Sequence, residues 1–165
     1  MKNLFSAAVL ILALMVAFSG YSQRKPRIKG NRSVVSVEKS LPPFTHLVLA
    51  DEFELHLQQG SETAVRIEAD DNLIDILRFD VSEQTLTISS FYTITSSKKL
   101  ELILEYRHLE HIHVTGGKIS GSEALNTDNL ELTLVEGAGA DLSIRAAFVG
   151  LKMEGNSSAD LRIEA

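Results

Sequence analysis

From Val34 onward, apolar and polar residues alternate with a period of two in short segments. Such alternation places every second side chain on one face of an extended strand. Turn residues follow several of these segments, at Gly60, Gln84 and Ser96-Ser97. The alternating apolar sets are Val35 and Val37; Leu47 and Leu49; Phe53, Leu55 and Leu57; Val65 and Ile67; Leu86 and Ile88; and Leu100, Leu102 and Leu104. The pattern predicts an all-β domain, with a single helical turn over residues 72–77 behind the candidate caps Asp71 and Asn72.

An internal repeat in the second half predicts how the strands are arranged. Each copy contains two short strands joined by a small-residue turn, over residues 136–140 in one copy and 155–159 in the next. A fainter copy places Ile112, Val114 and Gly116 at 20 positions before Leu132, Leu134 and Glu136. In the clearer pair, six residues recur 19 positions later: Leu132, Leu134, Ala140, Asp141, Leu142 and Ile144 become Leu151, Met153, Ala159, Asp160, Leu161 and Ile163.

Two short strands cannot bury an apolar side alone, but units stacked at about 4.8 Å can. We therefore predict a β-solenoid, single-stranded and β-helix-like, with irregular N-terminal strands. The inward positions would be Leu132, Leu134, Leu142, Ile144, Leu151, Met153, Leu161 and Ile163. An antiparallel β-sandwich is the alternative fold, although it gives no reason for a fixed interval. Because the sequence stops inside the strand-like segment 161–165 without a cap, we expect a domain incomplete at its C-terminus, or an open end that forms a homo-oligomer.

The N-terminus predicts export. Lys2, the apolar run of residues 4–18 and the small residues around Gly20 to Ser22 are typical of a signal peptide over residues 1–22. A flexible leader, rich in Arg, Lys, Pro and Gly, is expected over residues 23–32, followed by the domain over 33–165. The chain has no cysteine, which excludes disulfides and a lipid-modified cysteine. We expect a periplasmic or cell-surface protein with no transmembrane segment after signal cleavage.

Charge argues against nucleic acid as a partner. The formal net charge is -6, and the basic residues cluster only over 24–32 and at Lys98-Lys99. Phosphate binding requires many clustered cations. The expected partner is instead an unknown surface glycan or protein.

Candidate metal ligands are few. His111 and His113 would project from one face of a strand and could share an ion with Glu110 or with a carboxylate of a neighbouring strand, and His108 lies nearby. Asp70, Asp71 and Asn72 place three oxygen-bearing side chains in one turn, as a hard cation would need. We favour an exposed polar face for the histidines and a cap for the aspartates, so no metal and no cofactor is predicted.

Catalytic signatures are absent from the sequence. There is no cysteine nucleophile, no Gly-x-Ser-x-Gly and no His-Glu-x-x-His, and Ser120 and Ser122 fit turns. The segment Gly137 to Asp141 is similar to calcium-binding nonapeptide repeats, but its period is wrong for them. We predict no enzyme, and structural turns at Gly116, Gly137, Gly139 and Gly155.

An ordered set of short motifs runs through the chain over residues 33–165. Its residues are Phe44 and Leu47; Glu52 to Leu55; Leu57 to Gly60; Val65; Ile67 to Leu73; Gln84 to Leu86; Ile88; and the turns near Gly116, Gly137 and Gly155. In their order and spacing these motifs resemble the family described as putative auto-transporter adhesin, head GIN domain, found in exported proteins of Bacteroidetes-type bacteria. The first glycine turn, Thr115-Gly116-Gly117-Lys118, departs from the Gly-Ala-Gly type at Gly137. The resemblance implies a β-helix-like domain and transfers no catalytic residue.

The leading functional hypothesis is an exported, non-enzymatic binding or adhesion-like module. A structural module that self-associates through its open end is one alternative. A carbohydrate-active β-helix enzyme is another, and would need two carboxylates about 5 to 10 Å apart.

Overall fold

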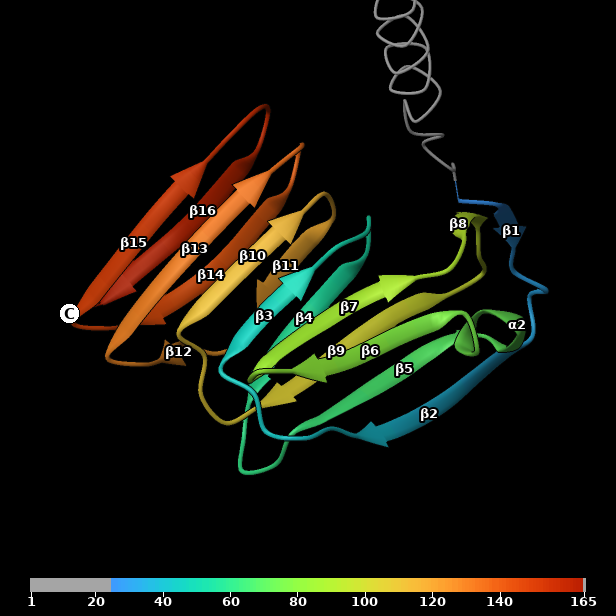
Figure 1. Cartoon of the computed structure of the whole chain (residues 1–165), viewed down its shortest axis with the longest axis horizontal. Helices are drawn as coiled ribbons and strands as arrows, with labels where there is room; N and C mark the ends of the chain where they lie inside the picture. Colours follow the sequence, from blue (N-terminus) through green and yellow to red (C-terminus); the bar gives the residue numbers. More distant parts are fainter. Residues whose placement is uncertain (1–24, 165) are drawn as a thin grey trace, which may run out of the picture.

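The computed structural model describes residues 25–164, and the predicted signal peptide lies outside this part of the chain. Two large sheets face each other across one apolar core (Figure 1). The six-stranded sheet has the order β15 (Phe148–Met153), β13 (Asn129–Val135), β10 (His111–Thr115), β3 (His46–Leu49), β7 (Thr85–Ser90) and β6 (Leu77–Ser82). The eight-stranded sheet has the order β12 (Leu125–Asn126), β14 (Gly139–Arg145), β11 (Lys118–Gly121), β4 (Glu54–Gln59), β9 (Leu100–Tyr106), β5 (Ala64–Asp70) and β2 (Val34–Ser40), with β16 (Ser158–Glu164) also paired to β14.

In the repeat units, β13, β14, β15 and β16 alternate between the two sheets, and equivalent strands of successive units pair in parallel. Leu132 of β13 is in register with Ile112 of β10 and Leu151 of β15, while Leu142 of β14 is in register with Leu161 of β16. The predicted superposition of the repeats is therefore confirmed. The antiparallel sandwich is wrong for this half of the domain, because its units pair in parallel.

The antiparallel strands lie at the other end of the domain, where irregular strands were expected. β5 pairs antiparallel with both β2 and β9, and β6 pairs antiparallel with β7. The β6–β7 hairpin turns through Glu83 and Gln84, whose φ values are 48° and 61°. Two successive positive φ values match the right-handed twist of a hairpin. Sequence periodicity missed β6 because the expected helical turn overlapped its start; the helix α2 covers only Asp71–Ile74.

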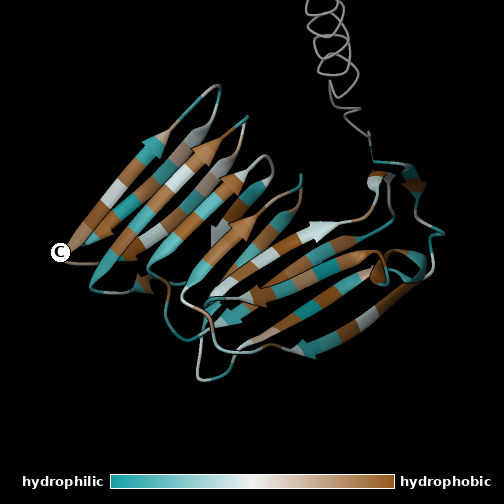
Figure 2. Ribbon diagram, viewed as in Figure 1, coloured by the Kyte–Doolittle hydropathy of each residue, from teal (hydrophilic) through white to brown (hydrophobic). Residues whose placement is uncertain are grey.

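The core follows the predicted alternation. Hydrophobic and hydrophilic residues alternate along the strands (Figure 2), and the inward side chains of Leu47, Leu55, Ile112 and Leu132 are almost fully buried. The prediction fails in the last unit, where Leu151, Met153 and Ile163 are 46%, 40% and 54% exposed. β15 is the outermost strand of its sheet and β16 pairs with β14 alone, so these side chains have core neighbours on one side only.

Part of the segment expected as a flexible leader forms a short strand. β1 (Arg27–Lys29) pairs in parallel with β8 (Thr93–Ser96), which brings Ile28 beside Ile94. The backbone N–H of Gly30 donates to the carbonyl of Ser96 at 2.8 Å. The alternation Arg-Ile-Lys supplies one apolar residue for this short pairing, a signal too brief to predict a strand.

Three of the four glycines expected in turns have a positive φ. Gly116, Gly137 and Gly155 have φ values of 72°, 85° and 68°, which residues with a side chain rarely adopt. Gly139 instead begins β14. Glu136, directly before Gly137, is also left-handed, with a φ of 54°.

Candidate functional site

The outward face of the six-stranded sheet carries polar side chains in rows. Parallel in-register pairing sets Thr85, His46, His111 and Glu131 side by side across β7, β3, β10 and β13. The next row contains Thr87, Val48, His113, Thr133 and Lys152. A shallow hollow is lined by residues of both rows. We call this surface, defined by the two rows and Glu110, the histidine face.

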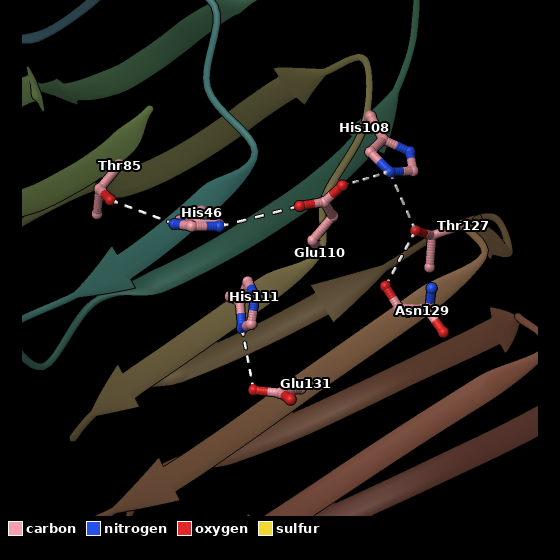
Figure 3. Close-up of polar contacts among 8 residues, drawn as sticks. All are labelled: His46, Thr85, His108, Glu110, His111, Thr127, Asn129 and Glu131. Carbon is pink, nitrogen blue, oxygen red and sulfur yellow. Dashed lines mark hydrogen bonds and ion pairs between the residues drawn. The ribbon is translucent and has the colours of Figure 1, made fainter. Parts of the chain in front are cut away.

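Two imidazoles are in contact at its centre. The rings of His46 and His111 have centroids 4.4 Å apart and meet edge to face, with an interplanar angle of 86° (Figure 3). Strand pairing causes this contact, since His46 and His111 are register partners on adjacent parallel strands. Glu110 directly precedes β10, and its side chain reaches the two imidazoles, with Oε2 lying 4.0 Å from Nε2 of His46.

Further polar groups hold these three side chains. Oε1 of Glu110 lies 3.5 Å from Nε2 of His108, and Nδ1 of His111 lies 3.1 Å from Oε2 of Glu131 (Figure 3). Nδ1 of His46 lies 3.5 Å from the hydroxyl oxygen of Thr85. Thr127 contacts His108 at 3.4 Å and donates to the carbonyl oxygen of Asn129 at 3.2 Å. The cluster therefore has a surrounding shell of partners from four loops and strands.

The structure changes the pairing expected from sequence. His111 and His113 do share the outward face of β10, but Nε2 of His113 contacts the hydroxyl of Thr115 at 3.0 Å. The three side chains whose ligand atoms converge are His46, Glu110 and His111. Sequence analysis missed His46 because it is far from His111 along the chain. The two residues meet only through the register of the parallel pairing between β3 and β10.

The aspartate candidates serve a different purpose. Asp70 is fully buried, and its carboxylate accepts hydrogen bonds from the backbone N–H groups of Arg32, Lys98 and Lys99 at 3.1, 3.0 and 3.3 Å. Burial alone would raise the pKa of Asp70, but these N–H donors, with the charge of Lys98, lower it below its usual value. Asp71 is exposed at the start of α2.

Asn72, next in this segment, also binds backbone. Its side-chain oxygen accepts from the N–H of Asn31 at 2.8 Å, and its side-chain nitrogen donates to the carbonyl of Lys29 at 3.0 Å. The segment 70–72 thus holds the residues that follow β1. The side-chain cap expected for the helical turn does not form: Asp70 occupies the N-cap position of α2 and makes no side-chain capping bond.

The opposite sheet carries one polar contact that sequence reasoning missed. Ser120 of β11 and His56 of β4 are register partners, and the hydroxyl lies 2.7 Å from Nδ1 of the imidazole. Asp141 is the next register partner of Ser120. Ser120 therefore lies in a strand rather than in the turn expected for it.

Within residues 25–164, no helix has the length and apolar character needed to cross a bilayer.

The fold defines an all-β protein with mostly parallel sheets and an exposed polar face. The chain belongs to the family described as putative auto-transporter adhesin, head GIN domain, which matches residues 43–163. The resemblance seen in the sequence is therefore confirmed. The family's description names an adhesin and implies no catalytic activity. No curated protein matches the chain.

Solved structures share this fold. A putative adhesin from Parabacteroides merdae has a TM-score of 0.74 at 16% identity, over 82% of this chain and 59% of that chain. One from Parabacteroides distasonis has a TM-score of 0.74 at 14% identity, with the same coverage of 82% and 59%. A putative adhesin from Bacteroides fragilis has a TM-score of 0.58 at 13% identity, over 81% of this chain and 99% of that chain. The chain thus spans less than two thirds of the length of the first two, and identities this low show the fold alone.

Proposed function

We propose that this protein is an exported, non-enzymatic binding module of the adhesion type, acting in the periplasm or at the cell surface. The observation that carries the proposal is the histidine face. The side chains of His46, His111 and Glu131 point outward from neighbouring parallel strands, while the alternate residues of the same strands are buried in the core. A face of this kind offers aromatic edges, hydroxyls and carboxylates to a partner without using any core residue.

The proposed scaffold is a β-solenoid whose two walls are the parallel parts of the two sheets. Support comes from the register of three successive units, in which Ile112, Leu132 and Leu151 pair in turn. Stacking of this kind spaces outward side chains at about 4.8 Å along each row. A fixed spacing on a rigid wall suits an extended partner, such as a surface glycan or a protein strand.

Nucleic acid is not the proposed partner. Of the two basic residues near the end of β8, Lys99 forms ion pairs with Glu68 and Glu101, each at 2.9 Å. Its charge is therefore offset on the surface, and counterion release from a nucleic acid would gain little there.

A binding screen of residues 25–165 on arrays of surface glycans and surface proteins tests the proposal. We expect a retained partner whose binding falls in His113→Ala and Thr133→Ala, because both side chains line the hollow. His56→Ala is the matched control, since His56 is an exposed strand histidine on the opposite sheet. A blank screen, or equal losses in His56→Ala and His113→Ala, would contradict the proposed face.

Self-association is a second candidate function, favoured by apolar side chains on β15 and β16. Phe148, Leu151, Met153 and Ile163 are 57%, 46%, 40% and 54% exposed. Large apolar side chains exposed at these levels favour contact with another surface. Light scattering over a range of concentrations tests this function, and a constant monomer mass would rule it out.

A further inference from the structure

We propose that His46, Glu110 and His111 form a binding site for one divalent transition-metal ion, with Zn²⁺ as the expected occupant. One ligand atom from each side chain lies within 4.8 Å of the other two. Two imidazoles and one carboxylate are a ligand set that zinc uses in proteins, with water completing the coordination.

The distances are those of a site close to assembled. In a tetrahedral zinc site with bonds of about 2.0 to 2.1 Å, ligand atoms lie about 3.4 Å apart. Closing the present separations requires shifts of roughly 1 Å or more, which rotation of side-chain torsions supplies. The side chains are free to make them, since those of His46, Glu110 and His111 are 36%, 47% and 48% exposed.

Strand pairing supplies the preorganisation. His46 and His111 are register partners on adjacent parallel strands, so the sheet fixes their Cα atoms about 4.8 Å apart with both side chains outward. Two histidines two residues apart on one strand, such as His111 and His113, start farther apart, at about 6.6 Å. The same sheet therefore favours the cross-strand pair over the pair that sequence spacing suggests.

The outer partners fit the same assignment. Metal-bound histidines commonly donate their other ring N–H to a carboxylate or another oxygen, which fixes the ring. Nδ1 of His111 lies 3.1 Å from Glu131, and Nδ1 of His46 lies 3.5 Å from the Thr85 hydroxyl. Both Nε2 atoms are then left for the metal. Oε1 of Glu110 lies 3.5 Å from Nε2 of His108, while Oε2 is the oxygen nearer His46.

Charge supports a dication. When the imidazoles are neutral, Glu110 and Glu131 bring two negative charges to the cluster. Within residues 25–164, neither carboxylate forms an ion pair with a lysine or arginine. The two carboxylates would balance the charge of one Zn²⁺. Zinc binding does not require the partner of the proposed function, so the two can fail separately.

Isothermal titration of tag-free residues 25–165 with ZnCl₂ tests the site. We expect one ion per chain, and a loss of affinity in His46→Ala and His111→Ala greater than the roughly 10- to 100-fold cost of losing an outer hydrogen bond. Glu131→Ala should weaken binding within that range of about 10- to 100-fold, since Glu131 positions His111 without binding the ion. His113→Ala, a histidine on the same strand and face, should bind zinc as the parent does.

Imidazole NMR signals give a second readout, in which zinc should shift those of His46 and His111 and leave His56 unchanged. Absence of saturable binding would overturn the site, as would equal losses in His113→Ala and His111→Ala. Repeating the partner screen in EDTA separates the two proposals: the histidine face can bind its partner with the metal site refuted, and zinc can bind when the screen is blank.

Discussion

Gly117 lies directly against the backbone of Phe53, whose carbonyl oxygen accepts a hydrogen bond from the N–H of Lys118 at 2.7 Å. A Cβ at position 117 would lie 2.6 Å from that oxygen and 2.8 Å from the Phe53 nitrogen. Gly117 also has a φ of 76°. The turn between β10 and β11 therefore depends on glycine for both space and conformation.

Gly117→Ala should be destabilising by about 2 to 4 kcal/mol, since it combines a left-handed residue with a backbone clash. Gly139→Ala is the matched control. Gly139 begins β14, where a Cβ would lie 3.4 Å from the Lys118 side chain and could be accommodated. Urea unfolding of both variants measures the difference, and similar midpoints would show that the Gly117 turn is adaptable.

The repeat offers a matched pair in the core. Leu132 is 1% exposed and Leu151, its register partner, is 46% exposed. Leu132→Ala should cost about 2 to 5 kcal/mol because it leaves a cavity, whereas Leu151→Ala should cost less than about 1 kcal/mol. Chemical denaturation of the monomer tests this ordering, and equal losses would mean that Leu151 is covered in solution.

Asp70→Asn should lower the melting temperature at neutral pH by on the order of 5 °C, because a neutral amide replaces an acceptor of three backbone N–H groups. Asp71→Asn, one residue along and exposed, is the control. The lowered pKa of Asp70 means that its carboxylate stabilises the fold above the pKa of the unfolded chain. That stabilisation is lost as the pH falls through the lowered value, below about pH 4.

The difference between the parent and Asp70→Asn should therefore be full at neutral pH and shrink in strong acid. Thermal melts across this range measure it. A difference that grows as the pH falls would contradict the assignment of Asp70 as a hydrogen-bonded carboxylate.

Removing β1 should loosen β8. The N–H of Thr93 donates to the carbonyl of Pro26 at 2.9 Å, and the Thr95 hydroxyl donates to the carbonyl of Ile28 at 3.0 Å. A chain beginning at Gly30 loses both bonds, so amides of residues 93–96 should exchange about tenfold faster or more than in a chain beginning at Lys25. Hydrogen exchange measures this, and unchanged protection would show that β8 is ordered without β1.

Sequence periodicity predicted most of the strands, and the repeat predicted the register of the repeated strands. A fixed interval separates Leu132 from Leu151 because equivalent strands of successive units pair side by side. Among the strands that periodicity did not predict are β1 and β6. The first has three residues, and the start of the second overlapped a helical pattern around Leu73 to Leu77. Local signals of that length are compatible with several structures until a partner strand is known.

The candidate site shows the same limit. His111 was identified from its own strand, whereas His46 joins it through a pairing between segments far apart in the chain. Asp70 was identified for its oxygen atoms, but its partners are backbone N–H groups of distant residues. Residue type suggested the chemistry, and the three-dimensional register decided which groups met.

In-register parallel pairing also makes the histidine face modular. Each unit contributes one residue to every row, as Glu131 follows His111 and His111 follows His46; the next unit adds Gly150, which has no side chain. Duplicating one unit would thus lengthen each row by a single step of about 4.8 Å while leaving the older positions undisturbed. Gene duplication would therefore lengthen such a face by one unit at a time, which suits it to a longer polymer. Point substitutions could then change the side chains of each new unit independently.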